Sequence, residues 1–185
     1  MSSRVGSLLI SHPNVPAESI FYKSVIYVYS DSPRKGTLGL IVNKPTQFAF
    51  AELAASRGWD IPLTRDYIRI GGPVNEQALL LLHTDDWRST NTTHIKGGIC
   101  LTSDEFMIEK ISYSQPPAYW RIMGGVCSWA PGQLDMELQG QPPYRPENSW
   151  LTATTQLGLL FEVDGERQWE KALELSSQQM INSYF

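Results

Sequence analysis

The sequence has few cysteines, no long apolar run and no excess of basic residues. Cys100 and Cys127 are its only cysteines, and they do not form a CxxC pair. A chain of 185 residues can bury a core without covalent cross-links, so we predict a reduced protein without a disulfide. The N-terminal residues 1–10 lack a signal-peptide cleavage site, and no apolar stretch approaches the roughly 20 residues of a membrane-spanning helix. We therefore expect a cytoplasmic protein with no membrane partner.

The charge pattern argues against a nucleic-acid-binding surface. The 15 Lys and Arg residues are outnumbered by 19 Asp and Glu residues, which gives a formal net charge of −4. The basic residues are scattered, and the densest pair, Arg34 and Lys35, falls in a turn that contains Pro and Gly. Because specific DNA-binding proteins cluster cations against several phosphates, we expect no direct, specific binding to DNA.

The sequence also lacks a complete metal-binding or nucleophile motif. The segment His83–Asp86 offers an imidazole and two carboxylates, but these crowd one short turn and no second cluster completes a site. A nucleophile elbow needs glycine two positions after the nucleophile, whereas Trp129 follows Cys127 at that spacing and Ala130 follows Ser128. We therefore predict no metal, no other cofactor and no catalytic residue, and we interpret Cys127 as a small core residue.

The residues that are present have the composition of a globular domain. A hydrophobic fraction of 42% and a charged fraction of 18% argue against a largely disordered chain. Apolar, β-rich runs recur, and several are apolar throughout, which is typical of strands buried on both faces. About eight strands are predicted, at residues 5–10, 24–29, 38–42, 67–70, 78–82, 98–101, 119–123 and 157–163.

Four helices are predicted between and after these strands. The first covers residues 50–57, and the second follows the capping-box pattern Thr102–Glu105. A third begins near Pro131, and the last runs from about Gly165 with an apolar stripe along one side. We therefore predict a single compact α+β domain over the whole chain, with a large mixed β-sheet system.

Four stretches, read in order, carry a family signature. They are Gly6–Pro13 with Lys23–Tyr27, then Gly39–Pro45, then Gly71–Val74, and finally Ser128–Leu138 followed by Glu147–Leu151. In this order and spacing they resemble the YqgE/AlgH family of bacterial proteins. The resemblance implies a compact cytosolic α+β domain with a large mixed sheet. It supplies no reaction, but the family name comes from an association with the regulation of alginate synthesis, which favours a regulatory role.

The most suggestive local arrangement is the segment Gly124–Gln133, where a strand leads through small residues into a helix N-terminus. Free backbone N–H groups and the helix dipole at such a junction can hold an anion or a carbonyl oxygen. We favour a structural interpretation, in which the glycines allow close strand packing and Pro131 starts the helix.

Polar turns that follow apolar strands are further candidates, because ligand-facing loops gather at strand ends. Asn43 precedes Lys44 and Pro45, and a Gly-Gly-Pro turn begins at Gly71, although turn geometry alone explains both. Because burying an unpaired Asn is costly, we expect Asn148 to bond to the backbone. It would thereby brace the Pro-rich loop against the Trp129 turn.

Our leading hypothesis is a non-enzymatic regulatory protein that binds a small molecule or another protein. The candidate binding residues are Asn43, Gly71, Gly72, Trp129 and Gln133. The alternative is a small-molecule hydrolase or transferase that uses the Cys127-Ser128-Trp129 turn as an anion or oxyanion site. A deep polar pocket at that turn, with a base within hydrogen-bonding reach, would favour the enzyme, and a shallow packed surface would favour binding.

Overall fold

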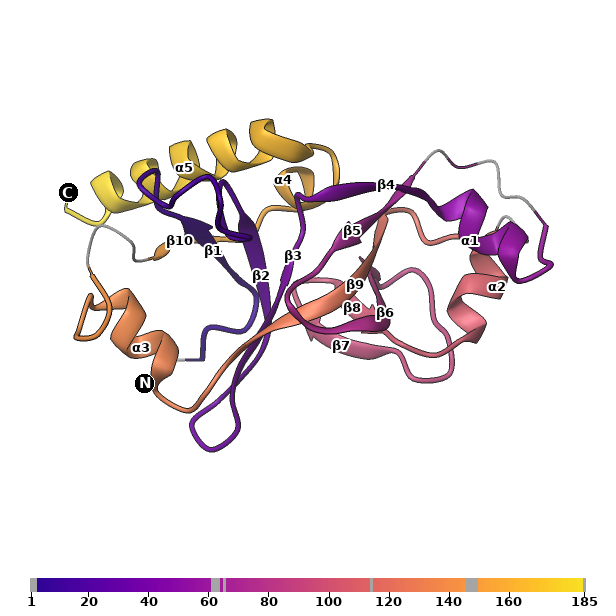
Figure 1. Cartoon of the computed structure of the whole chain (residues 1–185), viewed down its shortest axis with the longest axis horizontal. Coiled ribbons are helices and arrows are strands. Elements are labelled where there is room, and N and C mark those ends of the chain that lie inside the picture. The colour runs from indigo at the N-terminus through magenta and orange to yellow at the C-terminus, as the bar shows by residue number, and fades with distance from the viewer. Residues whose placement is uncertain (1–2, 61–63, 65, 114, 146–149, 185) are drawn as a thin grey trace.

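One curled sheet runs through both halves of the molecule (Figure 1). The computed structural model describes residues 3–60, 64, 66–113, 115–145 and 150–184. The strands are β1 (Ser7–Ser11), β2 (Val25–Ser32), β3 (Gly36–Ile41), β4 (Pro45–Ala49), β5 (Tyr67–Ile70), β6 (Val74–Thr84), β7 (Thr93–Lys96), β8 (Ile99–Thr102), β9 (Trp120–Trp129) and β10 (Trp150–Thr154). The helices are α1 (Phe50–Ser56), α2 (Phe106–Ser112), α3 (Gln133–Leu138), α4 (Leu157–Phe161) and α5 (Gly165–Asn182).

Strand β9 is the central connection of this sheet. It pairs antiparallel with β3 and β6, and parallel with β5. The main path of hydrogen-bonded neighbours is β10-β1-β2-β3-β9-β6-β8-β7, and β4 joins the sheet through its antiparallel pairing with β5. The parallel β5–β9 pair makes the sheet mixed. The predicted α+β class with a large mixed sheet is confirmed.

Alternate residues of β1 face two different cores. Leu8 and Ile10 pack in the same cluster as Trp169 of α5, whereas Leu9, between them, packs in the cluster of Leu134 from α3. In Figure 1, α5 accordingly lies above β1 and β2, and α3 lies below them. Because successive side chains of a strand point to opposite faces, a strand covered on both faces must be apolar throughout. The continuous apolar run of β1 is therefore explained by these two layers of helix.

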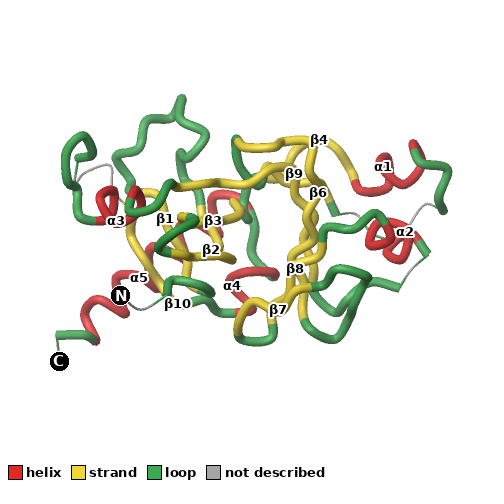
Figure 2. The backbone as a smooth tube through the Cα atoms, turned by 90° about the horizontal axis from the view of Figure 1, so that it is seen from below, coloured by secondary structure: helices red, strands yellow, loops and turns green. Residues whose placement is uncertain are grey.

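A third core lies under α1 and α2. Phe50 of α1 and Met107 of α2 pack with Leu81 of β6 and Ile122 of β9. Figure 2 places these two helices together at the end of the molecule that is distant from α3 and α5. Helices α1, α3 and α5 occupy the predicted segments. In the part of the chain that the structure describes, no helix is both long and apolar enough to cross a membrane.

The strand predicted at residues 157–163 is wrong, because residues 157–161 form helix α4. A short apolar run does not distinguish a buried strand from a buried helix. Here Leu159 and Leu160 are buried in the core that α5 covers, and the edge of β1 is already paired with β10. The apolar run therefore packs as a helical turn beneath α5.

Strands β4, β7 and β10 were missing from the sequence prediction. Most side chains of β4 and β7 are exposed, so neither strand carries a continuous apolar signal. Strand β10 lies at the edge of the sheet and follows the Pro-rich segment. The strand that the sequence predicts after this segment is at residues 157–163, further along the chain. Burial therefore identifies central strands in this sequence more readily than edge strands.

Helix α2 begins later than the capping-box pattern predicts. Thr102 is the last residue of β8, where its backbone pairs with Leu81. The cap is instead provided by Asp104, whose Oδ1 accepts a hydrogen bond from the backbone N–H of Met107 at 3.2 Å. An Asp side chain satisfies free helical N–H groups as well as a Thr does, so the start of the helix shifts without loss of a cap.

Candidate functional site

The end of β9 and the start of α3 form a sharp corner. Gly132 adopts φ = +78° as the N-cap of α3, a left-handed conformation that glycine adopts without steric cost. Residues four positions apart share one face of a helix, so Gln133 and Glu137 lie on the same side of α3. The corner turns that side back towards Trp129, the last residue of β9.

The Glu137 carboxylate joins three side chains at this corner. Its Oε2 accepts hydrogen bonds from the indole N–H groups of Trp129 at 2.9 Å and of Trp150 at 2.7 Å. Its Oε1 accepts a hydrogen bond from the Gln133 amide at 2.9 Å. The Gln133 oxygen in turn accepts a hydrogen bond from the backbone N–H of Ala130. All three donors to Glu137 are neutral, so they fix the position of the carboxylate without neutralising its charge.

A pocket of about 590 Å³ opens beside this carboxylate. This volume is in the range of small-molecule sites. The described part of the lining comes from residues 11–21, the start of β6, the end of β9, α3, residues 143–145 and Trp150. Aromatic rings are prominent in it: Phe21 meets Trp150 at 5.4 Å and 83°, and Trp129 meets Trp150 at 6.0 Å and 83°. We refer to this site as the Trp129–Trp150 pocket.

Cys127 borders this pocket but is not placed as a nucleophile. Its side chain is 2% exposed, and its thiol donates to the Gly71 carbonyl at 3.5 Å. Burial raises the pKa of the Cys127 thiol to about 12, so the thiol stays protonated at neutral pH. Strand β9 also continues through Cys127 and Ser128, with no elbow there. Among the described lining residues, Glu137 is the one acid and no histidine is present.

Trp129 and Gln133 are therefore brought together in one site, whereas Asn43 lies elsewhere. Asn43 is buried, and its Oδ1 accepts a hydrogen bond from the backbone N–H of Val25 at 2.8 Å. Its amide group donates to the carbonyls of Lys23 at 2.9 Å and Gly165 at 3.0 Å. Asn43 thus connects β2 to the start of α5. The expected role of Asn148 concerns a residue outside the described part of the chain.

Gly71 and Gly72 lie against the backbone of β9, and their role in this arrangement is close packing. A Cβ atom on Gly71 would come within 2.2 Å of the Gly125 carbonyl oxygen, and one on Gly72 within 2.1 Å of the Val126 backbone. The two glycines therefore let the β5–β6 connection lie directly against β9. The residue that follows them, Pro73, lines the pocket.

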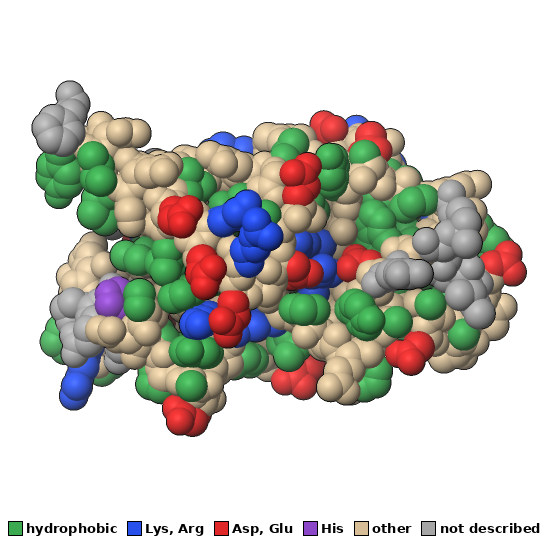
Figure 3. All heavy atoms as spheres, turned by 90° about the horizontal axis from the view of Figure 1, so that it is seen from above, with side chains coloured by type: hydrophobic (Ala, Val, Ile, Leu, Met, Phe, Trp, Pro, Cys, Tyr) green, Lys and Arg blue, Asp and Glu red, His purple; other side chains and the backbone are tan. Residues whose placement is uncertain are grey.

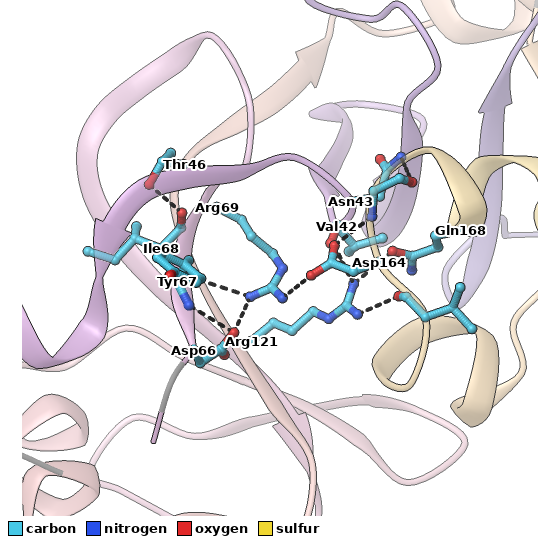
Figure 4. Close-up of polar contacts among 12 residues, drawn as sticks. Val42, Asn43, Thr46, Asp66, Tyr67, Ile68, Arg69, Arg121, Asp164 and Gln168 are labelled. Carbon is cyan, nitrogen blue, oxygen red and sulfur yellow. Dashed lines mark hydrogen bonds and ion pairs between the residues drawn. The ribbon is translucent and has the colours of Figure 1, made fainter. Parts of the chain in front are cut away.

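A buried arginine pair, which the sequence analysis did not single out, connects α5 to the sheet (Figure 4). Arg121 of β9 donates to the Val42 carbonyl at 2.6 Å, to Gln168 at 2.8 Å and to the Val163 carbonyl at 2.6 Å. Burial, together with the nearby charge of Arg69, lowers the pKa of Arg121 to about 10. Arg121 therefore remains charged at neutral pH.

The second arginine of this pair, Arg69 of β5, is neutralised by two carboxylates. Its guanidinium lies 2.8 Å from Asp66 and 2.5 Å from Asp164. These contacts with the protein's own carboxylates make the cluster a structural connection. A signal for both arginines does exist in the sequence, because each interrupts an apolar strand segment, at Tyr67–Ile70 and Trp120–Met123. A cation in a buried strand requires a partner.

His83 is also held by the protein itself. It is fully buried, with Nδ1 2.7 Å from the Thr84 carbonyl and Nε2 2.9 Å from the Thr102 hydroxyl. Burial lowers the pKa of His83. Across the described ranges, no group of three His, Cys, Asp or Glu residues is placed to hold a metal ion.

Charges of both signs are interspersed on the molecular surface seen in Figure 3. On that face, Lys and Arg side chains lie beside Asp and Glu side chains. Among the ion pairs of the described residues, Lys23 Nζ lies 2.9 Å from Glu166 Oε2. This face therefore provides no extended area of positive charge.

Comparisons with known proteins agree over nearly the whole chain. The profile of a family described as AlgH-like matches residues 8–181. A UPF0301 protein of Methylococcus capsulatus is 33% identical over 171 residues, which cover 91% of this chain and 89% of that protein. A UPF0301 protein of Bartonella quintana is 31% identical over 177 residues, covering 91% of this chain and 87% of that protein.

Two solved structures share the fold. The solution structure of the AlgH protein from Pseudomonas aeruginosa matches with a TM-score of 0.75 and 24% identity, covering 94% of this chain and 89% of that chain. The crystal structure of a Corynebacterium diphtheriae protein matches with a TM-score of 0.69 and 20% identity, covering 92% and 85% respectively. At these identities the likeness concerns the fold alone.

Proposed function

This chain belongs to the AlgH-like family, and from that starting point we propose that it is a non-catalytic binding protein whose ligand occupies the Trp129–Trp150 pocket. The observation that carries the proposal is the Glu137 carboxylate, which holds two indole rings in fixed positions beside a cavity of about 590 Å³. Binding sites for small molecules combine apolar and aromatic walls with a few fixed polar groups. The pocket has this combination.

The chemistry of the pocket supports binding over catalysis. The Cys127 thiol is buried and its pKa is raised to about 12, whereas a catalytic cysteine needs a lowered pKa and access to substrate. The described acid of the pocket, Glu137, already accepts three hydrogen bonds. A general base must reach the proton that it abstracts. Both oxygens of Glu137 instead accept hydrogen bonds from the protein, so the carboxylate positions the two indoles and Gln133.

A regulatory role for this binding follows from the family resemblance, because the family name comes from an association with the regulation of alginate synthesis. Residues 143–145 and the first residue of β10 both contribute to the pocket wall. A ligand that contacts them would alter the surface that this part of the molecule presents to a protein partner. We propose that the regulatory signal is transmitted in this way.

The indole N–H resonances of the six tryptophans provide a direct test. A metabolite mixture is added to ¹⁵N-labelled protein, and the indole region of the spectrum is recorded. We expect the resonances of Trp129 and Trp150 to shift, while that of Trp87, whose N–H donates to the Gln115 carbonyl, stays in place. Assignment uses single Trp-to-Phe variants.

Two variants separate binding from catalysis. Cys127→Ala is expected to leave ligand binding unchanged, whereas Trp150→Phe removes one hydrogen bond to Glu137 and should weaken binding. A mixture that leaves every indole resonance in place would argue against the pocket as a binding site. Turnover of any compound that Cys127→Ala abolishes, in a protein with a normal melting curve, would establish the enzyme instead.

A further inference from the structure

We infer that the ligand of the Trp129–Trp150 pocket is an organic cation that carries an alkylated ammonium group. The inference rests on the binding role proposed above and assigns the chemical class of the ligand. Two features of the pocket carry it, namely the charge of Glu137, which pairs with no cation among the described residues, and the geometry of the rings of Phe21, Trp129 and Trp150 beside it.

The Glu137 carboxylate sets the sign of the charge. Its donors within the described part of the chain are two indoles and an amide, all of them neutral. Among the ion pairs formed within the described part of the chain, none includes Glu137. Neutral donors supply no counter-charge to the carboxylate, and a partly desolvated charge interacts more strongly with a ligand than one in water. A cation is therefore attracted to this wall, and an anion is repelled.

The aromatic rings provide the second contribution. The Trp150 ring contacts both of the others edge to face. Its centroid lies 5.4 Å from that of Phe21 and 6.0 Å from that of Trp129, with an interplanar angle of 83° in each pair. The electropositive N–H edges of both indoles point at Glu137, so these edges are already occupied. Trp129 is 4% exposed, whereas Phe21 and Trp150 are half-buried, so a ligand can meet the rings of the latter two. The faces of aromatic rings carry the negative part of the quadrupole and attract cations. Aromatic sites of this kind recognise alkylated ammonium groups.

Arg145 is the one cation among the described lining residues. Its side chain is exposed, so water and salt screen its charge. It therefore opposes a cationic ligand only weakly, and its removal should strengthen binding slightly. An anionic ligand would show the opposite dependence on this residue.

The test compares choline with 3,3-dimethylbutan-1-ol, a neutral molecule of nearly the same shape. Each is titrated into ¹⁵N-labelled full-length protein, and the indole resonances of Trp129 and Trp150 are followed. We expect choline to bind about five- to thirtyfold more tightly than the alcohol, as a cation–π contact combined with a carboxylate predicts. Acetate of the same ionic strength is the control for salt effects.

Four variants assign the preference for choline to individual residues of the pocket. Glu137→Gln and Phe21→Leu should each reduce the choline-to-alcohol ratio of affinities by at least about threefold. Glu174→Gln, which removes an exposed charge of the same sign from α5, should leave the ratio unchanged. Arg145→Gln should leave choline affinity equal or raise it.

The outcomes are distinguishable from those of the proposed function. Equal binding of choline and the alcohol, or preferential binding of the alcohol or of acetate, would overturn the cation assignment while leaving the pocket as a binding site. Shifts of Trp87 in place of Trp129 and Trp150 would move binding to another surface and overturn both. A choline preference that Glu137→Gln retains in full would also refute the assignment.

Discussion

Oδ2 of Asp164 lies 2.5 Å from Nη2 of Arg69, although the two residues are 95 positions apart in the chain. The other oxygen of the same carboxylate accepts a hydrogen bond from the backbone N–H of Gly165 at 2.9 Å and thus caps α5. One side chain therefore fixes the start of the C-terminal helix and neutralises a cation in the sheet. The two contacts depend on each other, because each positions the carboxylate for the other.

Removal of this charge should destabilise the protein. In Asp164→Asn, the Arg69 guanidinium, 5% exposed as a residue, loses one of its two carboxylate partners. Leaving a buried charge poorly compensated is costly, but the Asp164 side chain is 38% exposed, which reduces the effect. We expect the free energy of unfolding to fall by about 1–3 kcal/mol in urea titrations. Glu174→Gln is the control, and equal stabilities of the two variants would contradict a structural role for the pair.

Stability should also decrease as the pH falls below about 6.5, the ordinary pKa of histidine. Burial lowers the pKa of His83 in the folded protein. Between that lowered pKa and 6.5 the unfolded chain binds more protons than the folded one, so the free energy of unfolding rises with pH in this window. Asp86 and His94 also interact electrostatically with His83. Urea titrations at pH values from 5 to 8 measure the slope, and His83→Gln should reduce it below 6.5; an unchanged slope would assign the effect to other groups.

Truncation of Trp129 should mainly affect stability. Its side chain is 4% exposed and packs in the core cluster beneath α3. Trp129→Ala creates a cavity and removes one donor to Glu137, so we expect a loss of roughly 3–5 kcal/mol. Chemical denaturation measures this loss. Trp129→Phe retains most of the packing and should lose clearly less; similar losses in both variants would show that the hydrogen bond dominates.

The protein should not bind duplex DNA specifically. Its net charge is −4, and Lys23 and Arg69 are examples of cations already paired with carboxylates. A specific binder neutralises several phosphates with a clustered basic surface. Binding to genomic fragments is measured at about 150 mM salt, where weak electrostatic contacts are screened. Sub-micromolar, sequence-dependent binding would contradict this prediction and make direct DNA regulation the leading function.

Much of the fold follows from local sequence, because the central strands and three helices depend on nearby apolar residues and caps. Helix α5 is predicted from its own apolar stripe, and α1 from the segment that begins at Phe50. The segment Leu157–Phe161 was predicted incorrectly because its conformation depends on a distant event, the pairing of β10 with β1. Local propensity does not specify which segment occupies that edge.

In the candidate site, too, the residues that are close in sequence could be predicted and those brought together from distant segments could not. Trp129 and Gln133 were identified because they belong to one strand–helix corner that is visible in the sequence. Glu137 lies four positions after Gln133, so helical spacing could have indicated it as a partner. Phe21 could not be predicted, because its ring meets Trp150 only after two distant segments have folded together. The long-range part of the pocket is thus a property of the fold.

The position of β9 in the sheet has a consequence for biosynthesis. Strands β3, β5 and β6 are made before residue 120, yet all three pair with β9, and β1 pairs with β10 later still. On the ribosome, the edges of β3, β5 and β6 that pair with β9, and the edge of β1 that pairs with β10, therefore stay unpaired until the last third of the chain emerges. Unpaired strand edges are sites of aggregation, and pairings between distant segments form slowly. The nascent chain consequently exposes these edges until β9 and β10 emerge, and aggregation competes with folding during that interval.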